Sequence, residues 1–195
     1  LSVGFCQREY NHNNLIEMDN GLWTVKFNDE SITGKVYGGF GVSRPYKKVY
    51  MGEIRYGKQE GRWKYYYHST GKKEFDFNFK NGKRYGLNTE WYENGQKRGE
   101  RTYKDDKKDG LWIEWYENGQ KNVEGTFKDG KLDGLWIGWF ENGQKSFEGT
   151  YKDGKSDGLW IGWFENGQKE NEVTYKYGEI VEVIGMWNKN GSVKW

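Results

Sequence analysis

The sequence predicts an all-β protein, an elongated single-layer antiparallel meander of stacked β-hairpins. The chain of 195 residues contains 29 glycines and one proline but no alanine, which is the best helix former. It also contains 11 tryptophans, 15 tyrosines and 10 phenylalanines, and aromatic residues are enriched in strands. The third observation is a repeat of 24 residues, because a fixed period of this length is typical of architectures in which each unit packs on its neighbours.

The repeat is clearest from Gly110, where the segment Gly-Leu-Trp-Ile-Glu-Trp-Tyr-Glu-Asn-Gly-Gln-Lys begins, and it returns with few changes from Gly134 and from Gly158. Earlier units start at Gly86 and at Gly61, the latter with one extra residue in its turn. The flanking sequence is related but degenerate, as expected for terminal repeats that cap an array. We therefore predict a signal-peptide remnant and N-terminal tail (1–19), degenerate capping hairpins (20–57), the repeat array (58–181) and a C-terminal capping hairpin (182–195).

Each unit contains two turn signals. Asn118 followed by Gly119 predicts a two-residue type I′ turn, because this dipeptide is the strongest short-range signal for a β-hairpin. Residues 129–132, Asp-Gly-Lys-Leu, predict a looser four-residue turn into the next unit. One unit is therefore one hairpin.

Counting outward from these turns sets the register of the strands. Trp112 lies opposite Gly125, and Gly125 also lies opposite Trp136 on the following strand. The two pairings agree in side-chain parity, which a slip of one residue would destroy. The same counting places Trp115 opposite Asn122.

One row of tryptophans thus faces glycines across the strand pairs. Aromatic rings that cover strand glycines are a packing device in sheets. We therefore interpret the following set as structural: Trp112, Trp136, Trp160, Gly125 and Gly149.

A second row of tryptophans lies on the opposite face. Its members are Trp91, Trp115, Trp139 and Trp163, and the predicted register sets them beside Arg98, Asn122, Ser146 and Glu170. The last three neighbours are short or polar and leave the indoles partly open, whereas Arg98 is long enough to lie over Trp91 as a cation–π partner. The row is a candidate binding surface for sugar rings, another sheet or a peptide. The alternative is that these rings only stiffen the sheet.

Several consecutive units resemble the bacterial variant of the MORN repeat. The shared pattern is Gly-x-Trp-x-x-Trp/Tyr-Tyr/Phe-x-Asn-Gly-Gln-Lys followed by Glu-Gly-x-Tyr/Phe-Lys-Asp/Asn-Gly-Lys, and it covers residues 58–181 closely. The resemblance implies an elongated sheet of stacked hairpins, a scaffolding or binding role and no catalytic residues. Some bacterial members are assigned as antitoxins of toxin–antitoxin pairs, and eukaryotic members are linked to membrane lipids and to protein assembly. This chain departs from the pattern at Asn88, Arg101 and Val173.

Composition excludes several function classes. A net charge of +2, from 31 basic and 29 acidic residues, excludes a nucleic-acid partner bound through bulk electrostatics. One cysteine and two histidines leave no Cys/His metal cluster, so we expect no metal and no cofactor. Glu117, Glu141 and Glu165 occupy the same turn position in successive units, whereas a catalytic acid is normally a singular residue. We therefore expect no catalytic residue and no enzymatic activity.

The first six residues, Leu-Ser-Val-Gly-Phe-Cys, resemble the end of a signal peptide, with the small residues Gly4 and Cys6 ahead of Gln7. This pattern predicts an exported protein, periplasmic, surface-held or secreted, whose mature chain begins at Gln7. Lipidation at Cys6 and a cytoplasmic protein with an ordinary N-terminus are the alternatives.

Two function hypotheses remain. The first is a non-enzymatic scaffold or binding module that holds a protein or polysaccharide partner along its repeat face, with contact to membrane lipid as a less supported variant. The second is an antitoxin-like partner that neutralises a toxin.

Overall fold

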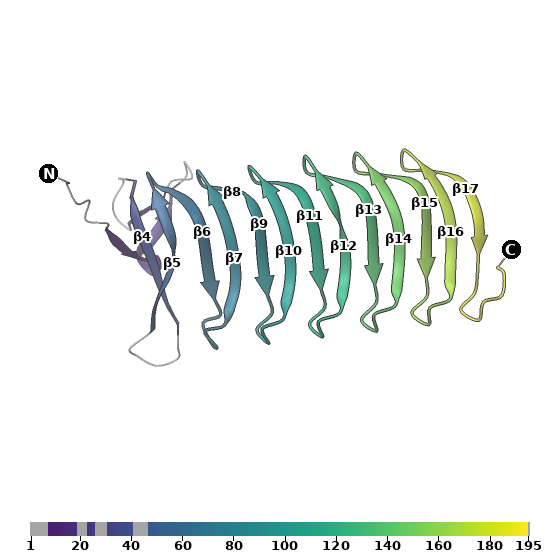
Figure 1. Ribbon diagram of the computed structural model, residues 1–195, viewed down its shortest axis with the longest axis horizontal. Helices are drawn as coiled ribbons and strands as arrows, with labels where there is room; N and C mark the ends of the chain where they lie inside the picture. The colour runs from purple at the N-terminus through teal and green to yellow at the C-terminus, as the bar shows by residue number, and fades with distance from the viewer. Residues whose placement is uncertain (1–7, 19–22, 26–30, 41–46, 195) are drawn as a thin grey trace. The chain divides into compact units, whose positions relative to one another are not determined.

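The structure is a computed structural model, and it describes residues 8–18, 23–25, 31–40 and 47–194. The chain divides into two compact units, residues 1–95 with 104–106 and residues 96–103 with 107–195. Strands make up nearly all the regular structure of the described residues, and the one helical element among them is a single 3-10 turn, so the predicted all-β fold is confirmed (Figure 1). None of these residues belongs to a helix that could cross a membrane.

The second unit is a meander in which each strand from β11 on pairs antiparallel with the next strand of the chain (Figure 1). The repeats of 24 residues are therefore hairpins, as the sequence predicted. The strands are β10 (Lys97–Lys104), β11 (Lys107–Trp115), β12 (Lys121–Lys128), β13 (Lys131–Trp139), β14 (Lys145–Lys152), β15 (Lys155–Trp163), β16 (Lys169–Lys176) and β17 (Glu179–Met186).

The first unit contains a sheet of the order β1-β4-β5-β6-β7-β9, with β8 paired to β7, and a separate two-stranded sheet of β2 and β3. Its elements are β1 (Glu9–Asn11), η1 (His12–Asn14), β2 (Leu15–Glu17), β3 (Trp23–Val25), β4 (Gly34–Phe40), β5 (Lys47–Arg55), β6 (Lys58–Tyr66), β7 (Lys73–Lys80), β8 (Lys83–Arg84) and β9 (Gly86–Trp91). The sequence predicted purely antiparallel pairing, but β1 and β4 run parallel, because β2 and β3 are inserted between them in the chain.

The hydrophobic core of the first unit lies where the N-terminal segments pack on the first hairpin. Val36, Ile54 and Trp63 have no exposed surface, and Leu15 and Ile32 are buried against them. Within the predicted N-terminal segment 1–19, residues 9–17 form β1, η1 and β2, and Leu15 belongs to this core. Residues 1–7, where the signal-peptide prediction falls, lie outside the described residues.

Both turns of each repeat differ in loop length from those predicted. At Asn118 the loop has three residues, because the Tyr116 N–H donates to the Gln120 oxygen at 2.9 Å and only Gly119 has a positive φ, 86°. This is a type I turn followed by a G1 bulge. The physical reason is the Asn118 carboxamide, which accepts the Gln120 N–H at 2.9 Å and thereby holds the turn from its side chain.

At the other end of the repeat, Lys128 pairs with Lys131, so the loop contains only Asp129 and Gly130. Their φ values are 50° and 86°, and a positive φ at both central residues defines the type I′ turn. The predicted four-residue turn at 129–132 is therefore wrong. Aspartate tolerates this left-handed conformation better than most residues with a side chain.

The predicted pairing of Trp112 with Gly125 is nevertheless confirmed, because two offsets of one residue cancel. The loop is one residue longer than predicted, and a bulge at Asn122 removes that residue again before Glu114 pairs with Val123. Trp115 lies between the loop and the bulge, so it is opposite Lys121 and not opposite Asn122. In the next hairpin the loop at Asp129 is two residues shorter than predicted. A register shift of two residues between Glu124 and Thr126 then restores the predicted pairing along the rest of the strands.

Hydrogen bonds between successive turns hold the repeats together at both ends of the strands. At the Asn-Gly turns, the Asn118 side chain donates to the Glu141 oxygen at 2.9 Å, and Asn142 does the same to Glu165 at 2.8 Å. At the Asp-Gly turns, the Gly154 N–H donates to the Leu132 oxygen at 2.8 Å. Each turn therefore satisfies a main-chain carbonyl of a neighbouring repeat.

We expect Gly125→Val to destabilise the protein by about 1–3 kcal/mol, as overpacking does, because the new side chain would overlap the Trp136 indole. Chemical denaturation monitored by far-UV circular dichroism measures the change. The control is a double-mutant cycle with Trp136→Ala, in which the valine should cost less once the indole is gone. A neutral or stabilising valine in the intact chain would contradict the register.

Candidate binding surfaces

The two faces of the sheet in the second unit carry different side chains, and we name each face after the side chains that recur on it. The aromatic face carries a continuous ladder of rings from Trp112 to Tyr175. Neighbouring ring centroids along it lie 4.8–6.2 Å apart, in tilted or edge-on contact. The ladder consists of Trp112, Phe127, Trp136, Tyr151, Trp160 and Tyr175.

Within this ladder the indoles of Trp136 and Trp160 each lie flat on a glycine of the preceding strand. A Cβ built on Gly125 would overlap the Trp136 ring, and one on Gly149 would overlap Trp160. The indole N–H of Trp136 donates to the Thr126 oxygen at 3.0 Å, and that of Trp160 donates to the Thr150 oxygen at 3.1 Å. These tryptophans thus lie where the sequence placed them, packed on the sheet with their polar atom satisfied.

The opposite face, the leucine face, carries a row of exposed leucines that sequence reasoning did not single out. Leu111, Leu135 and Leu159 are 37%, 50% and 43% exposed and recur once per repeat. Beside them on the same strands lie the half-buried Ile113, Ile137 and Ile161. The signal was in the sequence, because the parity that places Trp112 on one face places Leu111 on the other.

The predicted row of open tryptophans also lies on the leucine face, but its surroundings differ from the prediction. Trp115, Trp139 and Trp163 are half-buried, and each pairs with a lysine instead of the predicted polar residue, because the loop of each hairpin has three residues instead of two. A second lysine, from the preceding hairpin, lies over each ring. The distances from the ammonium nitrogen to the ring centroid are 5.7 Å for Lys97 over Trp115, 5.5 Å for Lys121 over Trp139 and 5.7 Å for Lys145 over Trp163.

In the first unit, Trp91 has the same kind of neighbour. The Lys73 ammonium lies 4.5 Å from its ring centroid, and the sequence analysis did not consider this lysine. Trp91 thus follows the same pattern as Trp115, Trp139 and Trp163.

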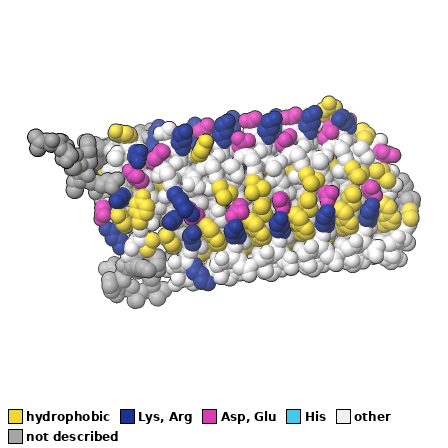
Figure 2. All heavy atoms as spheres, viewed as in Figure 1, with side chains coloured by type: hydrophobic (Ala, Val, Ile, Leu, Met, Phe, Trp, Pro, Cys, Tyr) yellow, Lys and Arg dark blue, Asp and Glu magenta, His cyan; other side chains and the backbone are white. Residues whose placement is uncertain are grey.

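The lysines that cover the tryptophans are held by acidic residues three positions further along the chain. Lys97 contacts Glu100 at 2.6 Å, Lys121 contacts Glu124 at 2.5 Å, and Lys145 contacts Glu148. Figure 2 shows basic and acidic side chains along the strands of the second unit, with hydrophobic side chains beside them. Because the charges compensate within each repeat, this face offers apolar contact more than net charge.

Four consecutive segments of the chain match the family model described as MORN repeat variant, namely residues 84–105, 108–129, 132–153 and 156–177. Residues 84–177 are an array of MORN repeat variants. MORN repeats are generally modules that mediate protein or membrane interactions, and their all-β scaffold is typically non-catalytic. A comparison with curated proteins found no match for this chain.

The MORN pattern is broken at Arg101, and the replacement fits its neighbours. Arg101 takes the position that Gly125 and Gly149 have in later MORN repeats, and its guanidinium lies 4.6 Å from the Trp112 ring centroid. The same group donates to a Glu114 oxygen at 2.8 Å. A planar cation therefore stacks on the indole that would otherwise lie on a glycine.

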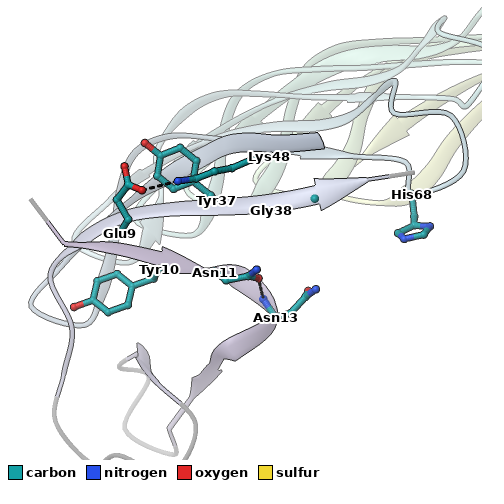
Figure 3. Close-up of a pocket in the computed structure, with 9 residues that line it drawn as sticks. Glu9, Tyr10, Asn11, Asn13, Tyr37, Gly38, Lys48 and His68 are labelled. Atoms are coloured by element: carbon teal, nitrogen blue, oxygen red, sulfur yellow. Dashed lines mark hydrogen bonds and ion pairs between the residues drawn. The ribbon is translucent and has the colours of Figure 1, made fainter. Parts of the chain in front are cut away.

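Outside the MORN repeats, the first unit contains a hollow of about 640 Å³ at the edge of β4 (Figure 3). Glu9, Tyr37 and Lys48 line it on one side of the strand, and Asn13 and His68 line it on the other. The Lys48 ammonium lies 2.5 Å from a Glu9 oxygen, and this hydrogen bond lowers the pKa of Glu9 and raises the pKa of Lys48. No group of three or more potential metal ligands occurs in this or any other described part of the chain.

Asp76 is the most deeply buried carboxylate that the structure pairs with cations, with a side chain only 3% exposed. Arg62 donates to both of its oxygens, at 2.5 and 2.6 Å, and Lys73 lies at 3.3 Å. Burial alone would raise the pKa of Asp76, but the hydrogen bonds and charges of Arg62 and Lys73 outweigh it and hold the pKa below its ordinary value. Ionised Asp76 therefore stabilises the first unit.

We expect Asp76→Asn to reduce the free energy of unfolding by about 1–3 kcal/mol at neutral pH, because it removes a buried charged hydrogen-bond acceptor. A carboxylate with a depressed pKa stabilises the fold above the ordinary pKa of aspartate, about 3.9, and loses that contribution as the pH falls through its folded value. The difference between the two proteins should be constant from pH 8 to about 5 and shrink below about pH 4. Urea titrations across this range measure it, and a difference that grows in acid would refute the assignment.

Proposed function

We propose that the MORN repeats form a non-enzymatic binding module whose leucine face holds an extended protein segment lying across the strands. The observation that carries this proposal is the row Leu111, Leu135 and Leu159, which keeps large apolar side chains in solvent at the same position of successive repeats. Contiguous apolar surface of this kind marks interaction sites in soluble proteins. The MORN family itself implies only a more general function, that of a scaffold that mediates interactions.

Repetition favours an extended partner over a compact one. Two strand spacings separate equivalent leucines, which is about 9–10 Å. Full burial of one leucine contributes about 1.5–3 kcal/mol, too little for stable capture after the entropy of association. Several equal contacts along one partner act together through their effective concentration. Affinity should therefore rise steeply with the number of intact repeats.

A protein segment fits this face better than a polysaccharide. Sugar rings stack on open aromatic faces, whereas a lysine ammonium lies over each of the indoles of Trp115, Trp139 and Trp163. We retain these three tryptophans as candidate contacts through their ring edges, and Trp91 as a separate candidate contact of the first unit. They support the same proposal, because apolar side chains of a partner can pack against both the leucines and the half-buried rings.

A photo-crosslinking amino acid at position 135 should capture this partner in the source cell. The matched control is position 180, because Ile180 is exposed to a similar extent, 57%, but pairs with Tyr175 of the aromatic face. We expect a product at position 135 that is absent at position 180, identified by mass spectrometry. The same product at both positions would exclude a binding surface restricted to the leucine face.

With that partner in hand, single changes Leu111→Ser, Leu135→Ser and Leu159→Ser should each weaken binding by roughly threefold to tenfold, because each leucine is about half exposed before binding. The triple variant should show no measurable binding by isothermal calorimetry, whereas Ile180→Ser should bind normally. One dominant leucine with two silent neighbours is the pattern of a compact partner with a single hot spot, and it would end the extended-partner proposal.

The cellular location also remains a proposal. Export rests on the signal-peptide pattern before Gln7, and N-terminal sequencing of the protein from its native host tests it. A chain that retains Leu1 would favour the cytoplasmic alternative. No observation favours the antitoxin-like alternative over the binding module.

A further inference from the structure

The hollow at the edge of β4 exists because β1 ends early. β1 pairs with β4 at only three positions, from Glu9 opposite Lys35 to Asn11 opposite Tyr37, while β4 continues to Phe40. The cause is local, since the Asn11 side chain accepts the Asn13 N–H at 3.0 Å and caps the 3-10 turn of η1. The turn directs the chain away from the sheet. Within the described residues, no strand therefore pairs with this edge of β4 beyond Tyr37.

The main chain of β4 presents hydrogen-bonding groups to the hollow. The Lys35 N–H donates to the Arg8 oxygen at 2.9 Å, which shows that Lys35 directs its main-chain groups toward β1. Since these groups alternate sides along a strand, Tyr37 and Gly39 direct theirs to the same edge. Gly39 lies beyond the last residue of β1 and has no side chain to shield its N–H and C=O. Glycine inside a strand often marks a place where another backbone approaches closely.

We propose that this edge binds a short extended peptide segment of another protein, which adds to β4 in the position that β1 vacates. Strand addition of this kind takes its affinity from main-chain hydrogen bonds and its specificity from the flanking walls. From Tyr37 to Phe40 the edge spans about 10 Å, enough for three or four residues of a strand. The proposal is independent of the leucine face, because the two sites lie in different units.

The side chains that line the hollow favour a ligand of low charge that binds through its main chain. Glu9 and Lys48 neutralise each other, so neither attracts an ionic ligand strongly. The Lys48 ammonium also lies 4.0 Å from the centroid of the Tyr37 ring and covers the aromatic face on which a sugar would stack. Asn13 and His68 on the opposite wall supply polar side chains for selectivity (Figure 3). An extended peptide is therefore favoured over an oligosaccharide.

The experiment uses the full chain and a phage-displayed library of random heptapeptides as the probe. The best selected peptide is synthesised with a fluorophore, and its affinity is measured by fluorescence anisotropy. Gly39→Pro removes the N–H at the open edge, and proline is tolerated at an edge position whose N–H does not enter the ladder to the neighbouring strand. We expect this variant to bind at least roughly tenfold more weakly, and Gly39→Ala, which keeps the N–H, to bind within about threefold of the original chain.

A second measurement does not depend on the folding of any variant. N-methylation of the peptide at one set of alternate residues should abolish binding, and methylation at the other set should leave it intact, because only one set faces β4. Hydrogen exchange should show that the Gly39 amide is protected when the peptide is bound. The Leu111, Leu135 and Leu159 triple variant should bind the peptide normally, which separates this site from the leucine face.

Three outcomes would overturn the proposal. The first is a selection that yields no peptide whose binding depends on the Gly39 N–H, and the second is N-methylation that weakens binding equally in both sets. The third is protection of the Gly39 amide by an oligosaccharide probe, maltohexaose or chitohexaose, in the absence of any selected peptide. That result would assign the hollow to a glycan.

Discussion

The contact on which the repeat fold depends is that of a tryptophan ring with a glycine on the preceding strand. Trp136 lies flat on Gly125 and donates its indole N–H to Thr126, and Trp160 repeats the arrangement with Gly149 and Thr150. In the first unit, Trp63 covers Gly52 and donates to the Glu53 oxygen at 3.1 Å. The ring can approach the backbone only where no Cβ intervenes. The contact therefore fixes which face each strand turns inward and leaves little freedom to slip.

Where the glycine is lost, residues on a neighbouring strand fit its replacement. Phe77 takes the glycine position of β7, and the following strand has Asn88 in place of tryptophan. Asn88 is almost fully buried, and its side-chain oxygen accepts the Asn78 N–H at 2.7 Å. In the last hairpin Val173 takes the same position and pairs with Val183. The third departure, Arg101, keeps Trp112 but stacks on it. The chain thus preserves the fit between strands even where it loses the residues that normally provide it.

The fold and the main register were predictable from the sequence, because a period of 24 residues and a hairpin turn in each unit constrain side-chain parity more strongly than the details of any loop do. Trp112 opposite Gly125 survived an error in the loop length because the bulge at Asn122 cancels the extra loop residue. The turn types were not predictable from the dipeptides alone. The Asn118 side chain, which contacts both Gln120 and the Glu141 carbonyl of the next repeat, decides its turn, and that contact requires the stacked neighbour.

The environment of the candidate site was harder to predict, for a related reason. The three-residue loop brings Lys121 opposite Trp115, and stacking brings Lys97 over the same ring from the preceding hairpin. Neither follows from the pattern of a single hairpin. The N-terminal elements escaped prediction because they do not repeat, and residues that occur once give no periodicity from which to infer a partner.

The difference between repeated and singular features also separates what the two surfaces can do. A face that presents the same leucine in each repeat can gain affinity only by adding contacts, so it suits a partner held along its length and tolerates the loss of any one contact. Within the described residues, the edge of β4 beyond Tyr37 is a stretch of main chain that no strand covers, and it lies outside the repeats. Loss of a single N–H there removes a large share of the main-chain hydrogen bonds that β4 can offer to a peptide. The two proposals therefore predict different responses to mutation, graded loss of binding on the repeated face and strong dependence on one residue at the edge of β4.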